Sequence, residues 1–368
     1  MEREELILIK ERLKIFRDKM EKENKGIEGF LVTNLKNLNY LTGFDGEGFA
    51  LIGASGKNYL LTDSRYTEQA QKESPDFKIL TDEPTKRNAR MLALEKILIK
   101  NKIKKIAFES NNLSYADFKK YSDSFSSTEF LPTENIIEQI RMIKNKEEII
   151  KIKKASQITT ESLKDVFEII EPGVRELDIA SELAYTMRKK GAQKESFDII
   201  VVSGERSSLI HGKPSEKKIA EGELILIDMG ANYHNYNSDI TRTVIMGKEN
   251  KKQKEIYSIV LEAQKAALEF LKPGVKCKEV DSVARDIIVK KGYGKYFGHG
   301  LGHGVGLDIH ELPRVSFNDD TVLLPGMVIT IEPGIYLPEI GGVRIEDSVL
   351  ITEAGYEILT WFPKILNL

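Results

Sequence analysis

Residues 223–246, ELILIDMGANYHNYNSDITRTVIM, contain two β-branched apolar runs on either side of a short polar connector. Such a pattern predicts an antiparallel hairpin. Asp228 ends the first run and Asp239 opens the second, so the hairpin can bring both carboxylates side by side on one face. The arrangement recurs at residues 328–346, where Glu332 ends one run and Glu346 ends the other. Each predicted hairpin therefore supplies a pair of carboxylates.

These four acidic residues lie in otherwise apolar runs, and His303 lies in a glycine-rich segment between the two hairpins. A carboxylate that is buried without a partner loses its hydration, so four converging carboxylates require compensating positive charge. Two metal ions supply that charge most simply. A carboxylate-rich set with one imidazole suits hard or borderline divalent ions, which favours Mn(II), with Co(II), Fe(II) or Zn(II) as alternatives, over a thiolate-type zinc site.

The second part of the chain also contains an internal repeat. The strings EPGVR at 171–175 and KPGVK at 272–276 each precede an amphipathic stretch that closes on Lys-Lys-Gly. His211 begins the string HGKP and His310 begins HELP, and in each half a glycine lies six residues before the acidic residue that ends the first run. Because these landmarks keep their order at offsets of roughly 100 residues, they predict a duplicated unit of helix, helix and hairpin. The predicted metal site would lie between the two pseudo-symmetric halves.

Five strings resemble the pita-bread metallopeptidases, a family that includes methionine aminopeptidase, Xaa-Pro aminopeptidase and Xaa-Pro dipeptidase (prolidase). They are IDMG at 227–230, SDITRT at 238–243, GHGLGHGVGLDIHE at 298–311, IEPG at 331–334 and VRIED at 343–347. More weakly, NYLTGF at 39–44 and LTDSRY at 61–66 resemble the amino-terminal domain of the proline-specific and creatinase branches. The resemblance implies an α/β amino-terminal domain at residues 1–130. It also implies an α+β pita-bread (creatinase/aminopeptidase) catalytic domain with an internal pseudo-two-fold repeat at residues 131–368.

The same resemblance implies roles for individual residues. The metal ligands would be Asp228, Asp239, His303, Glu332 and Glu346. The catalytic residues would be His211, His310 and Glu332, with the two histidines donating hydrogen bonds to the substrate oxygen and Glu332 also moving a proton. His299 would line the pocket on the proline side. Independently of the resemblance, strand alternation places Arg344 and Thr241 on the same side as the neighbouring ligands, where they would orient the carboxylates and Arg344 would bind substrate; an ordinary cross-strand ion pair is the alternative for Arg344. Tyr336, which flanks a turn, would bind substrate or only pack locally. His234, in the turn between the aspartates, is interpreted as a solvated turn residue.

The first third of the chain shows an α/β pattern. We expect Thr133 to cap the helices that open the catalytic domain. We predict helices at residues 2–24, 86–101 and 115–122, and strands at residues 29–32, 48–52, 59–62, 78–80 and 105–108.

The composition excludes several classes of protein. With 55 basic and 57 acidic residues, the chain offers no electrostatic reason to expect nucleic acid or an anionic membrane surface as a partner. No apolar segment approaches the ~20 residues of a membrane span, and the charged amino-terminal segment does not resemble a signal peptide. The single cysteine, Cys277, cannot form an internal disulfide. We therefore expect a cytoplasmic protein, and the family resemblance implies a homodimer.

The expected function is metal-dependent hydrolysis of the peptide bond between an amino-terminal residue and proline. The imino bond follows from the resemblance alone, and the choice between dipeptidase and aminopeptidase stays open. Asn37 stands where some aminopeptidase P sequences have an aspartate that helps to recognise the substrate amine, so the amino-end specificity also stays open. An alternative from another class is a metal-free pita-bread module that binds peptides or proteins. The presence of all five ligand residues disfavours this module, and it equally disfavours amidine hydrolysis of the creatinase type.

Overall fold

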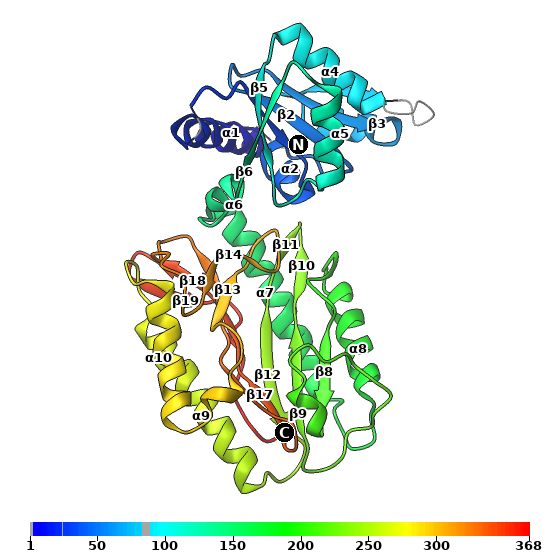
Figure 1. Ribbon diagram of the computed structural model, residues 1–368. Coiled ribbons are helices and arrows are strands. Elements are labelled where there is room, and N and C mark those ends of the chain that lie inside the picture. Colours follow the sequence, from blue (N-terminus) through cyan, green and yellow to red (C-terminus); the bar gives the residue numbers. More distant parts are fainter. Residues whose placement is uncertain (1–2, 24, 83–88) are drawn as a thin grey trace. The chain divides into compact units, whose positions relative to one another are not determined.

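The computed structural model describes residues 3–23, 25–82 and 89–368. The chain divides into two compact units, Met1–Ile140 and Arg141–Leu368 (Figure 1). The division falls after the boundary expected at 130/131, because strand β6 (Glu129–Thr133) pairs in parallel with β5 (Lys105–Glu109) and completes the sheet of the first unit. Thr133 is the last residue of β6, and its hydroxyl donates to the carbonyl of Phe108. The prediction that Thr133 caps a helix is therefore wrong.

The first unit contains a mixed six-stranded sheet with the order β4-β3-β2-β1-β5-β6. Its other strands are β1 (Gly29–Val32), β2 (Gly48–Gly53), β3 (Asn58–Asp63) and β4 (Lys78–Asp82). Its helices are α1 (Arg3–Glu23), α2 (Leu35–Thr42), α3 (Thr67–Glu73), α4 (Ala89–Asn101) and α5 (Tyr115–Ser124), with a 3₁₀ turn η1 (Ser64–Tyr66). The predicted strands and long helices are confirmed within the described residues, whereas α2 and α3 were not predicted. Residues 2, 24 and 86–88 of the predicted helices lie outside the described residues.

Both faces of this sheet are covered, because successive strand residues point to opposite sides. Leu31, Leu51 and Phe108 belong to a buried core that includes residues of α4. Phe30, the neighbour of Leu31, packs edge-to-face against Phe16 of α1, with ring centroids 5.0 Å apart. The first unit is therefore a three-layer α/β domain.

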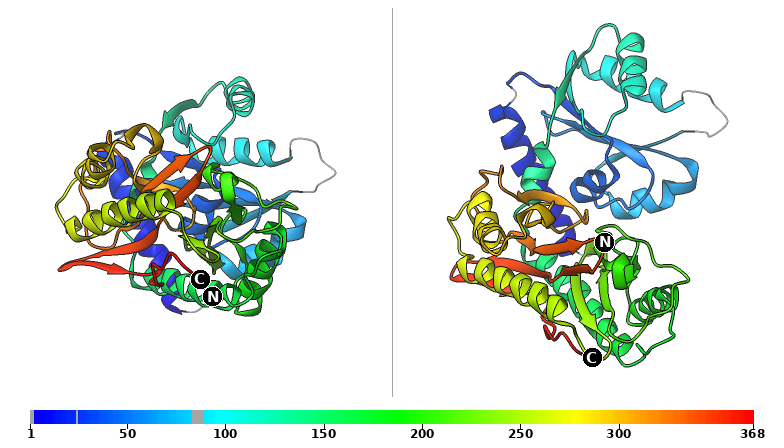
Figure 2. Two further views of the ribbon diagram at one scale, coloured as in Figure 1. Left: turned by 90° about the horizontal axis from the view of Figure 1, so that it is seen from below. Right: turned by 60° about the horizontal axis from the view of Figure 1, so that its bottom comes forward.

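The second unit contains two helix pairs around short sheets, and α8 lies on the opposite side of the central strands from α9 and α10 (Figures 1 and 2). The helices are α7 (Lys146–Phe167), α8 (Glu176–Lys189), α9 (Lys251–Phe270) and α10 (Cys277–Lys290), and α6 (Ile136–Arg141) spans the division between the units. The strands of the first half are β7 (Lys194–Glu195), β8 (Ile200–Ser203), β9 (Leu224–Met229), β10 (Ala231–Tyr233), β11 (Tyr236–Asn237) and β12 (Ile240–Ile245). Those of the second half are β13 (Gly302–Gly304), β14 (Glu311–Val315), β15 (Val328–Ile331), β16 (Gly334–Leu337), β17 (Gly341–Arg344), β18 (Asp347–Thr352) and β19 (Gly355–Ile358). Two 3₁₀ turns, η2 (Gly204–Ser208) and η3 (Gly294–Tyr296), complete this unit's elements.

Each half of this unit contains one of the two predicted hairpins, and each hairpin is broken in the middle. In the first half β9 pairs with β12 and β10 pairs with β11. In the second half β15 pairs with β18 and β16 pairs with β17. The breaks contain Asp239, Glu332 and Glu346, whereas Asp228 lies within β9. The backbone N–H of Glu346 donates to the carbonyl of Thr241 on β12 (3.1 Å), so the break in one hairpin is bonded to the other hairpin.

Separate apolar cores support the two halves. The first core joins α7 and α8 to β8, β9 and β12, and the second joins α9 and α10 to β15, β17 and β18. Cys277, the first residue of α10, is buried in the second core. None of the helices in the described residues is long and apolar enough to cross a membrane.

Candidate metal centre

The five residues predicted to bind metal converge in the second unit. One ligand atom from each of Asp239, His303 and Glu346 lies within 4.8 Å of the other two. The Nε2 atom of His303 is 3.2 Å from Glu332 Oε1 and 3.6 Å from Asp239 Oδ2. Asp228 lies opposite Thr241 in the β9–β12 pair and lines the same cleft as the other four. Both hairpins therefore contribute carboxylates to one site.

Several carboxylate oxygens of this site have no hydrogen-bond donor. Asp228 Oδ1, Asp239 Oδ1 and Glu346 Oε1 are buried and have no hydrogen-bond partner among the described residues. Burial raises the pKa of Asp239 and of Glu346 well above the ordinary values, and repulsion from neighbouring carboxylates raises both further. A buried acceptor without a donor costs about 1–3 kcal/mol. Divalent cations would supply the missing partners, and an oxygen-rich set with one imidazole suits such ions, so these residues fit a metal site.

His303 presents one defined nitrogen to the carboxylates. Its Nδ1 lies 3.0 Å from the carbonyl of Gly304, which can only accept a hydrogen bond, so Nδ1 carries a proton and Nε2 faces the site. Burial alone would raise the pKa of Glu332, but the hydrogen bond and the charge of His303 lower it to about 2. Burial lowers the pKa of His303, but its interactions with Glu332, the Gly304 carbonyl and Asp228 together outweigh this effect, and the net change is a raised pKa.

Arg344 links three side chains of the site. Its Nη2 donates to Asp228 Oδ2 (2.5 Å), its Nε donates to the Thr241 hydroxyl (3.0 Å), and that hydroxyl donates to Glu346 Oε2 (2.6 Å). Its Nη1 donates to the hydroxyl of Tyr336 (3.1 Å). One guanidinium thus fixes carboxylates from both hairpins.

The other predicted histidines surround this cluster. The ring centroid of His310 is 4.3 Å from that of His303. Burial lowers the pKa of His310, and the nearby imidazoles of His303 and His211 lower it further. His299 Nε2 lies 2.9 Å from the hydroxyl of Tyr336. His234 is exposed at the turn between β10 and β11 and does not line the cleft.

The cluster lines a cleft of about 1030 Å³. The predicted catalytic histidines His211 and His310 line it together with His299 and Arg344. Its remaining lining includes apolar side chains and cations from other segments, namely Phe197, Ile199, Ile200, Ile210, Lys213, Arg314 and Phe317. A cleft of this size with convergent polar groups suits a small ligand.

The profile of metallopeptidase family M24 matches residues 150–353, and that of the creatinase/prolidase N-terminal domain matches residues 12–143. The chain belongs to metallopeptidase family M24. A curated relative, the Xaa-Pro dipeptidase of Pyrococcus horikoshii, is 43% identical over 355 residues, which cover 96% of this chain and 97% of that protein. Among solved structures, the Xaa-Pro dipeptidase from Bacillus anthracis has a TM-score of 0.92 at 42% identity and covers 98% of this chain and 100% of its own. The X-Pro aminopeptidase from Thermotoga maritima has a TM-score of 0.85 at 43% identity and covers 95% and 99% of the two chains.

The family assignment confirms the predicted fold, a creatinase-type amino-terminal domain followed by a pita-bread domain, and the predicted class of metal-dependent peptidase. Two polar residues of this M24 site were not found from the sequence. The Asn237 amide donates to the carbonyls of Gly306 and Leu307 (3.0 and 3.1 Å) and ties the aspartate hairpin to the glycine-rich segment. The Thr330 hydroxyl accepts a hydrogen bond from the backbone N–H of His303 and donates one to Glu332 Oε1, each with a length of 3.0 Å. Thr330 is buried in β15, two residues before Glu332, which follows the strand directly. This two-residue spacing is the sequence signal that could have identified Thr330.

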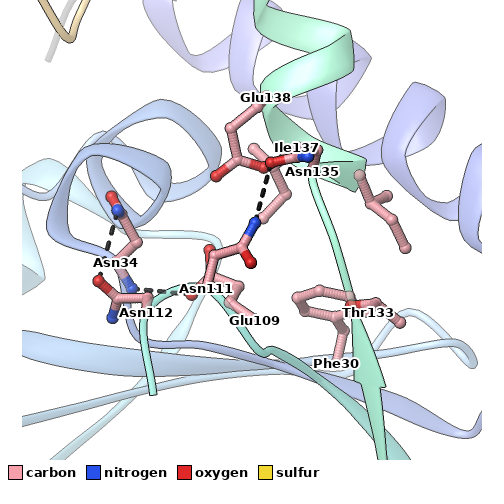
Figure 3. A pocket seen from close by; sticks show the side chains of 10 residues that line it. Phe30, Asn34, Glu109, Asn111, Asn112, Thr133, Asn135, Ile137 and Glu138 are labelled. Carbon is pink, nitrogen blue, oxygen red and sulfur yellow. Dashed lines mark hydrogen bonds between the residues drawn. The ribbon is translucent and has the colours of Figure 1, made fainter. Parts of the chain in front are cut away.

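The first unit of this family member contains a much smaller cavity of about 50 Å³ (Figure 3). Glu109, which lines the cavity, is buried, and its Oε2 accepts from the backbone N–H groups of Thr33 and Asn34. The Asn37 amide donates to Glu109 Oε1 (2.7 Å) and to Glu138 Oε1 (2.6 Å). Because its buried carboxylate is hydrogen-bonded, this cavity lacks the unpaired acceptors that distinguish the metal centre.

Proposed function

We propose that this chain is an Xaa-Pro peptidase that hydrolyses the bond between an amino-terminal residue and proline. The observation that carries the proposal is the group of buried carboxylate oxygens, on residues that line the cleft, for which the described part of the chain provides no hydrogen-bond donor. The names of relatives that cover nearly the whole chain support the substrate class. Asp228, Asp239, His303, Glu332 and Glu346 would hold two divalent ions, and Mn(II) suits their donor set best. Such ions would lower the pKa of a bound water and polarise the scissile carbonyl.

The chain's own side chains would perform the remaining steps. Glu332 would accept a proton from the attacking water and pass it to the leaving imino nitrogen, because its carboxylate lies inside the ligand cluster and lines the cleft. His211 and His310 would donate hydrogen bonds to the substrate oxygen as negative charge develops on it. His299, which lines the cleft, would contact the proline ring. Tyr336 does not line the cleft; its buried hydroxyl lies 2.9 Å from His299 Nε2 and would hold that imidazole in place rather than bind substrate as predicted.

The cleft also suggests a preference for short substrates. Besides Arg344, two cationic residues line it, Lys213 and Arg314. A dipeptide places its carboxylate one residue from the scissile bond, where a cation in the cleft can pair with it. We therefore propose Xaa-Pro dipeptides as the preferred substrates, with longer Xaa-Pro-Yaa peptides as the second candidate.

The decisive experiment compares an Xaa-Pro dipeptide with the matching Xaa-Pro-Yaa tripeptide before and after metal removal. Chelation should abolish hydrolysis, and Mn(II) should restore it, with kcat/KM higher for the dipeptide. Full activity with no metal detectable by elemental analysis would contradict the mechanism. A protein that binds Mn(II) and proline peptides without cleaving them would support the non-catalytic alternative instead.

We also propose, from the family resemblance, that the enzyme is a cytoplasmic homodimer. Analytical ultracentrifugation of the full chain tests the oligomeric state, and fractionation of cells that produce it tests the compartment.

A further inference from the structure

One loop of the second unit brings His211 to the cleft. Residues 203–215, here named the His211 loop, begin at the end of β8 and lead back towards β9. The loop contains η2, and its residues 210–214 line the cleft. The position of His211 therefore depends on what holds the two ends of the loop.

Both ends are held by one carboxylate. Glu176, the first residue of α8, has a fully buried side chain. Its Oε1 accepts from the N–H (2.7 Å) and the hydroxyl (2.9 Å) of Ser203, where the loop begins. Its Oε2 accepts from the N–H (3.1 Å) and the hydroxyl (2.7 Å) of Ser215, where the loop ends. Each carboxylate oxygen thus fastens one end of the loop.

An arginine within the loop completes the arrangement. Arg206 Nε lies 3.2 Å from Glu176 Oε2, so the buried carboxylate has a cationic partner. The same guanidinium donates through Nη2 to the carbonyl of Lys213 (2.6 Å), two residues beyond His211. Through Arg206, the Glu176 carboxylate is therefore linked to the backbone at Lys213, next to the segment that carries His211.

The internal repeat argues that this carboxylate serves the loop rather than its own helix. Counted from the repeated Pro-Gly-Val string, Glu176 at the start of α8 corresponds to Cys277 at the start of α10. In both helices, the backbone N–H of the residue before the helix donates to a carboxylate three residues further on. Arg175 donates to Asp178 before α8, and Lys276 donates to Glu279 before α10. Because α10 begins at the buried Cys277, a helix start of this kind does not require a carboxylate at the position that Glu176 occupies in α8. A buried carboxylate destabilises a fold unless it is hydrogen-bonded, and the side-chain bonds of Glu176 described above all go to the His211 loop.

We propose that Glu176 is a positioning residue that fixes His211 for catalysis. It acts through the loop and does not touch the substrate. The inference rests on the hydrolytic role proposed for His211.

The test is a double-mutant cycle between Glu176→Gln and His211→Ala in the Mn(II)-loaded enzyme, assayed with an Xaa-Pro dipeptide. Glu176→Gln should lower kcat roughly 10- to 100-fold, the range for groups that orient a catalytic residue, with metal content unchanged. In the His211→Ala background the same substitution should change kcat less than about twofold, because the residue through which it acts is gone. Equal losses in both backgrounds, or a folded Glu176→Gln enzyme with wild-type kcat, would overturn the proposal.

Asp178→Asn is the matched control, because it removes an exposed acid from the same helical turn. It should leave kcat unchanged. Hydrogen exchange supplies a readout that does not depend on activity: residues 203–215 should exchange faster in Glu176→Gln and normally in Asp178→Asn. If the wild-type enzyme cleaves no Xaa-Pro peptide, the proposed function fails. Unchanged exchange of residues 203–215 in Glu176→Gln would instead overturn the inference that Glu176 holds the His211 loop.

Discussion

The two histidines related by the internal repeat, His211 and His310, reach the same cleft but are held by different contacts. The His211 loop is fastened by hydrogen bonds from its own ends to Glu176. The segment that carries His310 is held by an ion cluster in which Glu311, the next residue, pairs with Arg141 (2.6 Å) and Lys144 (2.7 Å). Duplication therefore preserved the imidazoles but not the means of positioning them.

The ion cluster is buried. The side chains of Arg141, Lys144 and Glu311 are 2%, 1% and 4% exposed, so neither water nor salt screens them effectively. Arg141 also donates to Asp308 (2.7 Å), which fixes the turn before His310. By contrast, Arg206 beside Glu176 remains one-third exposed. We therefore expect the ion cluster beside His310 to contribute more to the free energy of unfolding. The contacts of Glu176 with the His211 loop should contribute more to the rate of catalysis.

The largest effect is expected where the two halves meet. Asp239→Asn from the first hairpin and Glu346→Gln from the second should each lower metal occupancy and abolish measurable turnover, because each removes a negative charge that the cations require. Both metal-free variants should remain folded, since the substitution relieves repulsion between buried carboxylates. Elemental analysis and circular dichroism check these outcomes. A variant that keeps two metals and a near-normal rate would remove that residue from the ligand set.

The next largest effect tests the ion cluster. Glu311→Gln leaves two buried cations with a neutral partner, and breaking a buried pair typically costs about 3–5 kcal/mol. Urea denaturation should show this loss of unfolding free energy. Glu357→Gln is the matched control: it removes the partner of Lys153 in an exposed pair, where about 0–1 kcal/mol is expected. Equal effects of the two substitutions would show that the cluster does not stabilise the second unit.

Catalytic effects of the two histidines come third. His211→Ala and His310→Ala should each lower kcat about 10²–10³-fold, the usual cost of removing a donor to a developing oxyanion. Metal content should not change, because neither residue is assigned as a ligand. His234→Ala should be nearly silent, since that side chain is exposed at a turn away from the cleft. Loss of a metal ion from His310→Ala would instead make His310 a ligand.

The sequence predicted the parts of this site that have a local signature. Asp228 and Asp239 stand at the ends of apolar runs, so strand periodicity alone placed them on a hairpin. Periodicity could not show that both hairpins break in the middle, because the break at Glu346 depends on a hydrogen bond to Thr241 in the other hairpin. Contacts between Glu176 and Ser215 likewise join residues far apart in the chain, and neither residue has an unusual neighbourhood in sequence.

The difference between local patterns and tertiary contacts also explains why the Thr133 cap was predicted wrongly and why short helices of the first unit were missed. Strands such as β2 and β3 follow from apolar runs, whereas Thr133 stands before an acid and a helical segment and so resembles a cap. In the structure, pairing with β5 extends the strand through Thr133. Short helices such as α2 depend on local caps: the Asn34 side chain accepts from the backbone N–H groups of Lys36 and Asn37. Tertiary pairing and single capping bonds carry little periodic signal, so pattern analysis misses them.

The smallest effect is a pH dependence of the ion cluster. Burial alone would raise the pKa of Glu311, but Lys144 and Arg141 outweigh it and hold the pKa below the ordinary value of 4.5. A carboxyl whose pKa is lower in the folded state stabilises the fold fully above its unfolded pKa, and this contribution is lost as the pH falls through the folded pKa. The difference in free energy of unfolding between wild type and Glu311→Gln should therefore stay constant from neutral pH down to about pH 5 and decrease below pH 4.5. Because the two proteins share every other carboxyl group, the difference between their urea midpoints isolates Glu311. A gap that persists undiminished well below pH 4.5 would mean that Glu311 contributes through its shape and hydrogen bonds rather than through its charge.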